Sequence, residues 1–180
     1  MRAVAVRVFG GNARHLLQQN DGSAAVEFAM VAAPFLALLF AVIETAIVFF
    51  ASQTLEAAAA DSARLVMTGQ AQSQGFDATK FKDAVCAKIY AIFDCAGKMA
   101  VDVRTFSNFS SVDTAKPVDA NGNVTLTPQY NPGQPGDIVL VRLIYQYPVA
   151  VSLFGYSLMN VSGGKYLMIA TNAFRNEPYK

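Results

Sequence analysis

The residues with the clearest chemical potential are two acids in the most apolar part of the sequence. Glu27 and Glu44 interrupt a run of small and apolar residues over 23–51, and the sixteen residues of 28–43 carry no charge. A carboxylate in the hydrocarbon region of a bilayer costs a few kcal/mol, so it needs a partner charge or a position near the headgroups. We therefore expect a specific role for Glu27. The alternative is that both acids lie at the ends of a membrane span and simply reach the headgroups.

The other reactive side chains form no catalytic motif. The only histidine, His15, precedes the apolar run, so no histidine-dependent triad or histidine metal cluster can form in the chain after residue 22. The two cysteines, Cys86 and Cys95, need further ligands to hold a metal. We expect no enzyme, no catalytic residue, no cofactor and no metal site. Five later acids are interpreted as solvated loop charges: Asp102, Asp113, Asp119, Asp137 and Glu177.

The apolar run is long enough to cross a membrane. As a helix, residues 23–51 would rise about 43 Å, against a hydrocarbon core of about 30 Å. The segment before the run carries an excess of basic residues, which keeps the N-terminus in the cytoplasm by the positive-inside tendency. These charges are Arg2, Arg7 and Arg14 against one acid, Asp21.

This reading divides the chain into three parts. We predict a cytoplasmic basic leader at 1–22, a transmembrane helix at 23–51 and an exported domain at 52–180. A buried core helix is the first alternative, but a chain of 180 residues rarely encloses so long a helix on every side. A cleaved secretory signal is the second, but its apolar region is usually about 7–15 residues long.

The entry to the apolar run resembles a known processing site. The stretch Asp-Gly-Ser-Ala-Ala-Val-Glu-Phe over 21–28 is similar to the cleavage region of type IV prepilin-like proteins. In that family a membrane-embedded peptidase cuts after the glycine on the cytoplasmic face. The resemblance implies a cut between Gly22 and Ser23, with Glu27 as the fifth mature residue and Phe28 as the sixth.

Such a cut would give Glu27 a partner. The new α-ammonium group of Ser23 in a neighbouring subunit could pair with the Glu27 carboxylate, and each charge would offset the desolvation of the other. Packing in register would then be favoured over slipped packing. This is a hypothesis about assembly, and it assigns Glu27 and Phe28 to the assembly surface.

A wider resemblance points to one branch of these proteins, the TadE-like pseudopilins of the tight-adherence (Flp) pilus. It rests on residues 22–29, on Ile43-Glu44, on AAAADSAR over 57–64 and on the closing Arg175-Asn-Glu-Pro-Tyr179. The resemblance implies a minor pilin in the bacterial inner membrane with a periplasmic domain, acting in pilus assembly, adhesion and surface attachment. The alternative is a permanently anchored periplasmic binding or scaffold protein.

The same resemblance implies the partners. They would be a prepilin peptidase, other pilin or pseudopilin subunits, the inner-membrane assembly platform and membrane lipid. A formal net charge of +1 gives no electrostatic footprint for nucleic acid, so we expect no nucleic-acid partner.

Periodicity predicts an α+β exported domain in which a long helix and a second helix pack on an antiparallel sheet, as in a pilin-like roll. The long helix continues to about Thr68, with an apolar stripe that a sheet would cover. The second helix runs over 78–93 with Asp77 as N-cap. The expected strands are 100–106, 138–147 and 165–175, with a short one at 124–127, and the expected loops are 69–75 and 107–136.

The two cysteines lie on the exported side of the predicted membrane. An oxidising compartment favours a disulfide between Cys86 and Cys95, joining the second helix to the turn that follows it. Two buried free thiols are the alternative.

Overall fold

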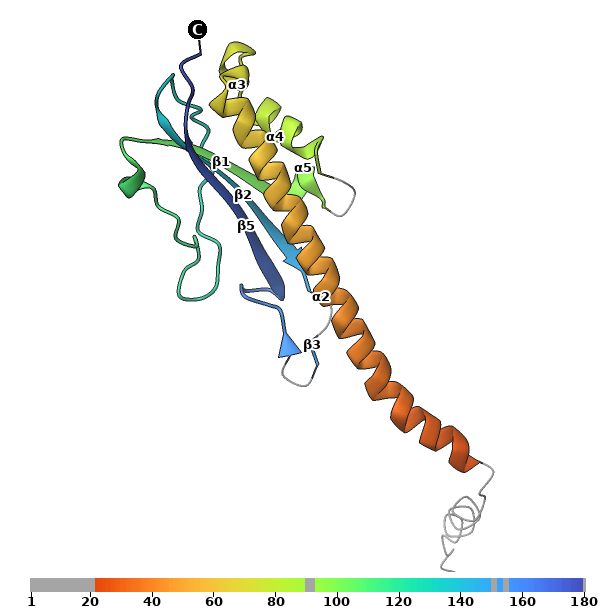
Figure 1. Cartoon of the computed structure of the whole chain (residues 1–180). Helices are drawn as coiled ribbons and strands as arrows, with labels where there is room; N and C mark the ends of the chain where they lie inside the picture. The colour runs from red at the N-terminus through yellow and green to blue at the C-terminus, as the bar shows by residue number, and fades with distance from the viewer. Residues whose placement is uncertain (1–21, 90–92, 150–151, 154–155, 180) are drawn as a thin grey trace, which may run out of the picture. The chain divides into compact units, whose positions relative to one another are not determined.

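The computed structural model describes residues 22–89, 93–149, 152–153 and 156–179, so the predicted leader lies outside the described residues except for Gly22. The fold is α+β, as predicted (Figure 1). The helices are α2 (Ser23–Met67), α3 (Gln70–Ser73), α4 (Ala78–Cys86), α5 (Cys95–Lys98) and the 3-10 turn η2 (Phe109–Ser111). The strands are β1 (Met99–Phe106), β2 (Ile138–Pro148), β3 (Ser152–Leu153), β4 (Tyr156–Ser157) and β5 (Lys165–Arg175).

Contacts divide the chain into two units, Met1–Ala41 and Val42–Lys180. The described part of the first unit is the beginning of α2, which contains Pro34 without a break in the helix. Its large apolar side chains are exposed; Phe28 is 75% and Met30 is 72% accessible. Since none of the described residues covers this apolar surface, it needs lipid or other helices around it.

The second unit is built on a three-stranded antiparallel sheet with the order β1-β2-β5. The central strand β2 pairs along its whole length with β5 and over eight residues with β1. Seven consecutive β2 residues, 139–145, are buried, so both faces of the sheet are covered there. The face along α2 carries apolar residues at alternate positions, such as Val103, Val141 and Leu143.

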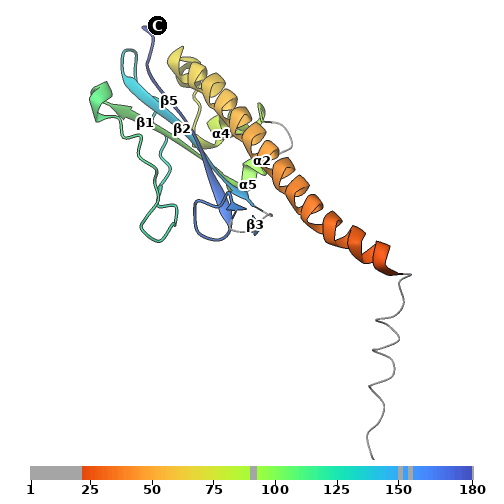
Figure 2. The ribbon, with the colours of Figure 1, turned by 60° about the horizontal axis from the view of Figure 1, so that its bottom comes forward.

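The main core lies between α2 and this sheet face. Figures 1 and 2 show the later turns of α2 running along one face of the three strands. Leu55, Ala59 and Val66 are at most 1% exposed and share one apolar cluster with the strand residues. The predicted apolar stripe is therefore the packed face of the helix. From α4, Phe81 and Val85 join the same cluster.

A segment without regular structure protects the free edge of β1. The Val103 amide donates to the Gln129 carbonyl at 2.8 Å, and the Asn131 amide donates to the Val103 carbonyl at 2.8 Å. Between them the ring of Tyr130 packs against Phe81, with centroids 5.4 Å apart. Burial raises the pKa of Tyr130 to about 12, and Asp77 contributes by charge repulsion. This pairing satisfies backbone groups that an open edge would expose.

Three local predictions were wrong in detail. The second helix ends at Cys86 instead of residue 93, because the Lys88 and Ile89 amides make i,i−3 bonds that tighten and end the last turn. The predicted loop at 69–75 contains the single helical turn α3. The predicted short strand at 124–127 is a single bridge between Val118 and Val124. The N-cap is as predicted, since the Asp77 side chain accepts from the Lys80 amide at 2.7 Å.

The C-terminal segment closes the end of α2. The Glu177 amide donates to the Met67 carbonyl at 2.9 Å, and the Asn176 side chain donates to the Pro132 carbonyl at 2.9 Å. The ring of Tyr179 lies over Gly69, where an added Cβ would come 2.2 Å from its Cγ. Gly69 also has a φ of 76°, so conformation and close approach both require glycine.

This contact predicts unequal costs for two glycine substitutions. Gly75 also has a positive φ, of 61°, but nothing lies within 4 Å of its added Cβ. Gly75→Ala should cost about 1 kcal/mol of unfolding free energy, and Gly69→Ala more than about 2 kcal/mol, because the clash adds to the backbone strain. Urea unfolding of the detergent-solubilised chain, followed by circular dichroism, measures both.

A double variant isolates the clash from the backbone strain. Adding Tyr179→Ala to Gly69→Ala should cost less than the sum of the two single changes, since the ring is no longer in the way. Equal losses for the two glycine variants would show that Tyr179 does not constrain Gly69.

Candidate functional site

The predicted processing site lies at the start of α2. Gly22 is exposed and directly precedes Ser23, the first residue of α2. Nothing lies within 4 Å of a Cβ added at Gly22. In contrast to Gly69, packing in the described structure does not require a glycine here. A requirement for an extended, accessible backbone in a protease would explain it instead.

Glu27 and Phe28 both present their side chains on the surface of the apolar helix. Glu27 follows Ser23 by four positions, so the two residues lie one turn apart on the same side of α2. The structure therefore places the predicted amine position and the predicted acid within one helical turn. It does not test their assigned roles.

Glu44 lies in the second unit and is partly buried. In an ideal helix the step of seventeen positions from Glu27 to Glu44 corresponds to a rise of about 26 Å. This is close to the thickness of the hydrocarbon core, so the two acids bracket one membrane-sized stretch of helix. That spacing suits positions near the two membrane interfaces, which is the alternative raised for both glutamates.

The motif AAAADSAR places small residues on the buried face of α2. Ala58, Ala59, Ser62 and Ala63 are buried, whereas the other four residues of 57–64 are exposed. The Ser62 hydroxyl donates to the Ala58 carbonyl at 2.6 Å, so this buried polar group is satisfied within the helix. Small side chains on one face allow the helix backbone to approach the sheet closely, and the motif therefore has a packing role here.

The structure joins Cys86 and Cys95 in a disulfide with a Cα–Cα distance of 5.6 Å. The bridge links the last residue of α4 to the first residue of α5. Asp94 caps α5, since its side chain accepts from the Gly97 amide at 3.2 Å. The disulfide thus links α4 to α5, which leads into β1. It stabilises the domain and is not part of the predicted processing site at the start of α2.

One acid was misinterpreted from sequence. Asp102 lies in β1 and is 1% exposed, not in a solvated loop. It accepts from Arg104 Nε at 2.9 Å and from the Gln129 amide at 2.9 Å. A signal was present in the sequence, because Asp102 and Arg104 alternate with valines in a β-rich run. The alternation shows that the two residues share the sheet face opposite the apolar one, but it does not show that this face is buried. The loop that buries this face is distant in sequence.

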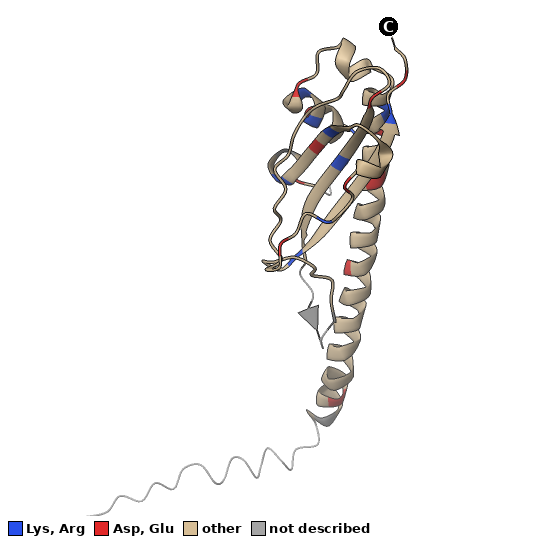
Figure 3. Cartoon of the chain, turned by 90° about the vertical axis from the view of Figure 1, so that its left-hand side faces the viewer, with Lys and Arg blue, Asp and Glu red and all other residues tan. Residues whose placement is uncertain are grey.

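Charged residues gather on the sheet face that points away from α2. Figure 3 views the molecule from that side and shows basic and acidic positions close together on the strands. The register places Asp102 opposite Arg142 of β2, which is 5% exposed. Sequence reasoning did not single out Arg142.

Comparison with known protein families gives a match to α2. The family model described as TadE-like protein matches residues 22–64. The match begins at the glycine of the predicted cleavage site and ends within the later turns of α2, so it includes Glu27, Glu44 and AAAADSAR. No curated protein and no solved structure matches the chain. The match confirms the resemblance to TadE-like proteins over this range.

Proposed function

We propose that the chain is a minor pilin or pseudopilin of a tight-adherence pilus, cut between Gly22 and Ser23 by a prepilin peptidase. It acts in pilus assembly, adhesion and surface attachment, and it has no enzymatic activity. The observation that carries the proposal is the TadE-like match, which starts at Gly22 and runs through an exposed apolar helix.

The shape of α2 supports a membrane-stored subunit. Ala24–Met67 is long and apolar enough to cross a bilayer, and its most apolar stretch is not buried in the chain. Residues 24–43 rise about 30 Å, which matches the hydrocarbon core. Under this proposal the leader lies in the cytoplasm, the helix in the bacterial inner membrane and the domain in the periplasm. Its partners are the peptidase, other pilin or pseudopilin subunits and the assembly platform.

Assembly would place the same helix against other helices instead of lipid. Glu27 has an exposed side chain, so a neighbouring subunit can reach its carboxylate. A cut after Gly22 places a positive charge at the first residue of α2, one turn from Glu27 in the same chain and within reach of Glu27 in the next. In a low-dielectric contact such a pair opposes slipped packing, because slipping would leave both charges desolvated and unpaired.

Cleavage is the first prediction. In cells with an active prepilin peptidase, intact-mass spectrometry and N-terminal sequencing should find Ser23 as the first residue. Gly22→Val should retain Met1 or a leader-containing N-terminus, because the added side chain would block the close approach of the peptidase to the backbone at the cut. Nothing lies within 4 Å of a Cβ added at Gly22, so the substitution should not disturb the described fold.

Gly11→Val is the matched control, since it makes the same change in the leader outside the matched range. It should be cut as in the natural chain. A natural chain that keeps its leader beside an active peptidase would contradict the proposal and support a permanently anchored periplasmic binding or scaffold protein.

The second prediction compares the two glutamates. Glu27→Gln keeps the size of the side chain and removes the charge, so membrane insertion should be unchanged. Co-purification with other pilin subunits should fall at least about tenfold, because the ammonium group of a neighbour loses its buried partner. Quantitative mass spectrometry of crosslinked membranes measures the recovery.

Glu44→Gln makes the same chemical change on the same helix near its other predicted interface. We expect co-purification within about twofold of the natural chain, as for a charge that reaches the headgroups. Equal recovery for the natural chain and Glu27→Gln would rule out the charge pairing.

A further inference from the structure

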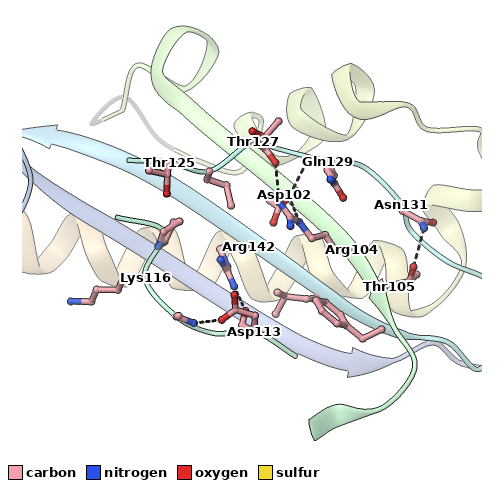
Figure 4. A pocket seen from close by; sticks show the side chains of 15 residues that line it. Asp102, Arg104, Thr105, Asp113, Lys116, Thr125, Thr127, Gln129, Asn131 and Arg142 are labelled. Carbon is pink, nitrogen blue, oxygen red and sulfur yellow. Dashed lines mark hydrogen bonds and ion pairs between the residues drawn. The ribbon is translucent and has the colours of Figure 1, made fainter. Parts of the chain in front are cut away.

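The second unit contains a polar cavity on the sheet face that points away from α2. Its volume is about 550 Å³, and it lies between strands β1 and β2 and the chain segment 113–131 (Figure 4). This volume falls within the range of about 300–1,000 Å³ that is typical of small-molecule sites. The charged side chains that line it are Asp102, Arg104, Asp113, Lys116 and Arg142.

Arg142 is the least satisfied of these groups. It is 5% exposed, and its Nε is buried with no hydrogen-bond partner. One Nη2 contact to the carbonyl of Asp113 is the only hydrogen bond that its guanidinium makes within the described chain. A buried guanidinium without a carboxylate is costly, since its remaining donors have given up water.

The acid opposite Arg142 forms no ion pair with it. Asp102 is its cross-strand neighbour, but the Asp102 carboxylate pairs with Arg104 Nε at 2.9 Å. Among the ion pairs of the described residues, within 4.0 Å, none involves Arg142. The Asp113 carboxylate accepts from the Ala115 amide at 2.8 Å, and the hydrogen bond from Arg142 goes to the backbone carbonyl of Asp113. Three basic groups against two acids leave the cavity with a surplus of one positive charge.

The remaining lining suits a ligand with hydroxyl groups. Thr125, Thr127 and Gln129 line the cavity with hydroxyl and amide groups, whereas the Asn131 amide is already bonded to Thr105 and Gly133. Such groups donate to and accept from alcohols. The planar guanidinium of an arginine matches a carboxylate with two parallel donors. Two carboxylates in the wall disfavour a dianion such as phosphate, whereas a single negative charge balances the surplus.

We propose that this cavity binds a sugar acid, with the ligand carboxylate on the Arg142 guanidinium and the ligand hydroxyls on the threonine and glutamine side chains. The source is a free sugar acid or a uronate unit of an acidic polysaccharide. The inference rests on Arg142 and its cavity, and it stands whether or not the chain is part of a pilus.

The test is a ligand titration of the full chain in detergent micelles. Isothermal titration calorimetry with glucuronate should give saturable binding. Glucose, which lacks the carboxylate, and inorganic phosphate should each bind at least about tenfold more weakly. A glucuronate oligosaccharide tests the source: tighter binding than the monosaccharide identifies a polysaccharide, and exclusion of the oligosaccharide identifies the free acid.

Two variants separate binding from folding. Arg142→Gln should lose at least about tenfold in glucuronate affinity. Lys116→Gln changes an exposed residue at the cavity, so it should weaken binding several-fold without disturbing the fold. Lys80→Gln, the same change at an exposed position on α4, should bind as the natural chain does.

Three results would overturn the proposal. The first is no saturable glucuronate binding by the folded natural chain at about 10 mM, which is beyond the range of a weak specific site. The second is equal affinity for glucuronate and glucose, or for glucuronate and phosphate. The third is unchanged glucuronate affinity in both Arg142→Gln and Lys116→Gln.

Discussion

One helix has to satisfy two different surroundings, and the rest of the structure follows from this constraint. The early part of α2 is apolar and exposed on all sides, whereas from Val48 onward one face of it is buried in the domain core. Removing apolar surface from water is favourable in both settings, but lipid accepts apolar side chains of any shape, whereas a folded core requires side chains that pack closely together. The aromatic residues Phe49 and Phe50 lie outside the buried face, which carries alanines together with aliphatic residues such as Leu55 and Val66.

The domain is organised around that small-residue face. Ala58, Ala59 and Ala63 leave room for the strands to approach α2 closely, and the central strand β2 then becomes buried on both sides. Gly69 and the C-terminal segment close the end of the helix, while the disulfide holds the turn between α4 and β1. These contacts stabilise the ends of the helices, and apolar packing stabilises their central parts. The segment over the outer sheet face creates the polar cavity as a consequence of covering β2.

Local patterns predicted most of the fold because they determine most of the elements. The apolar run and the helix formers after it gave the length of α2, and β-rich alternation placed β5 with its observed bounds. The end of α4 was missed because the tightened last turn, in which the Lys88 and Ile89 amides make i,i−3 bonds, is not visible in helix propensity. The burial of Asp102 and the isolation of Arg142 depend on segments that are more than twenty residues away, and no local pattern reveals such pairings. Periodicity alone does not predict the candidate processing site, which was inferred from the resemblance of residues 21–28 to prepilin cleavage regions.

We expect lipid to protect the early turns of α2 and the domain to protect the later ones. Hydrogen exchange of the full chain in lipid nanodiscs at increasing urea tests it directly, with peptides from 26–42 compared with peptides from 51–66. The amides of 51–66 should lose protection in the same transition as those of β2, while the amides of 26–42 remain protected by the bilayer. If 26–42 exchanges rapidly without urea, or loses its protection together with 51–66, lipid does not protect the early turns.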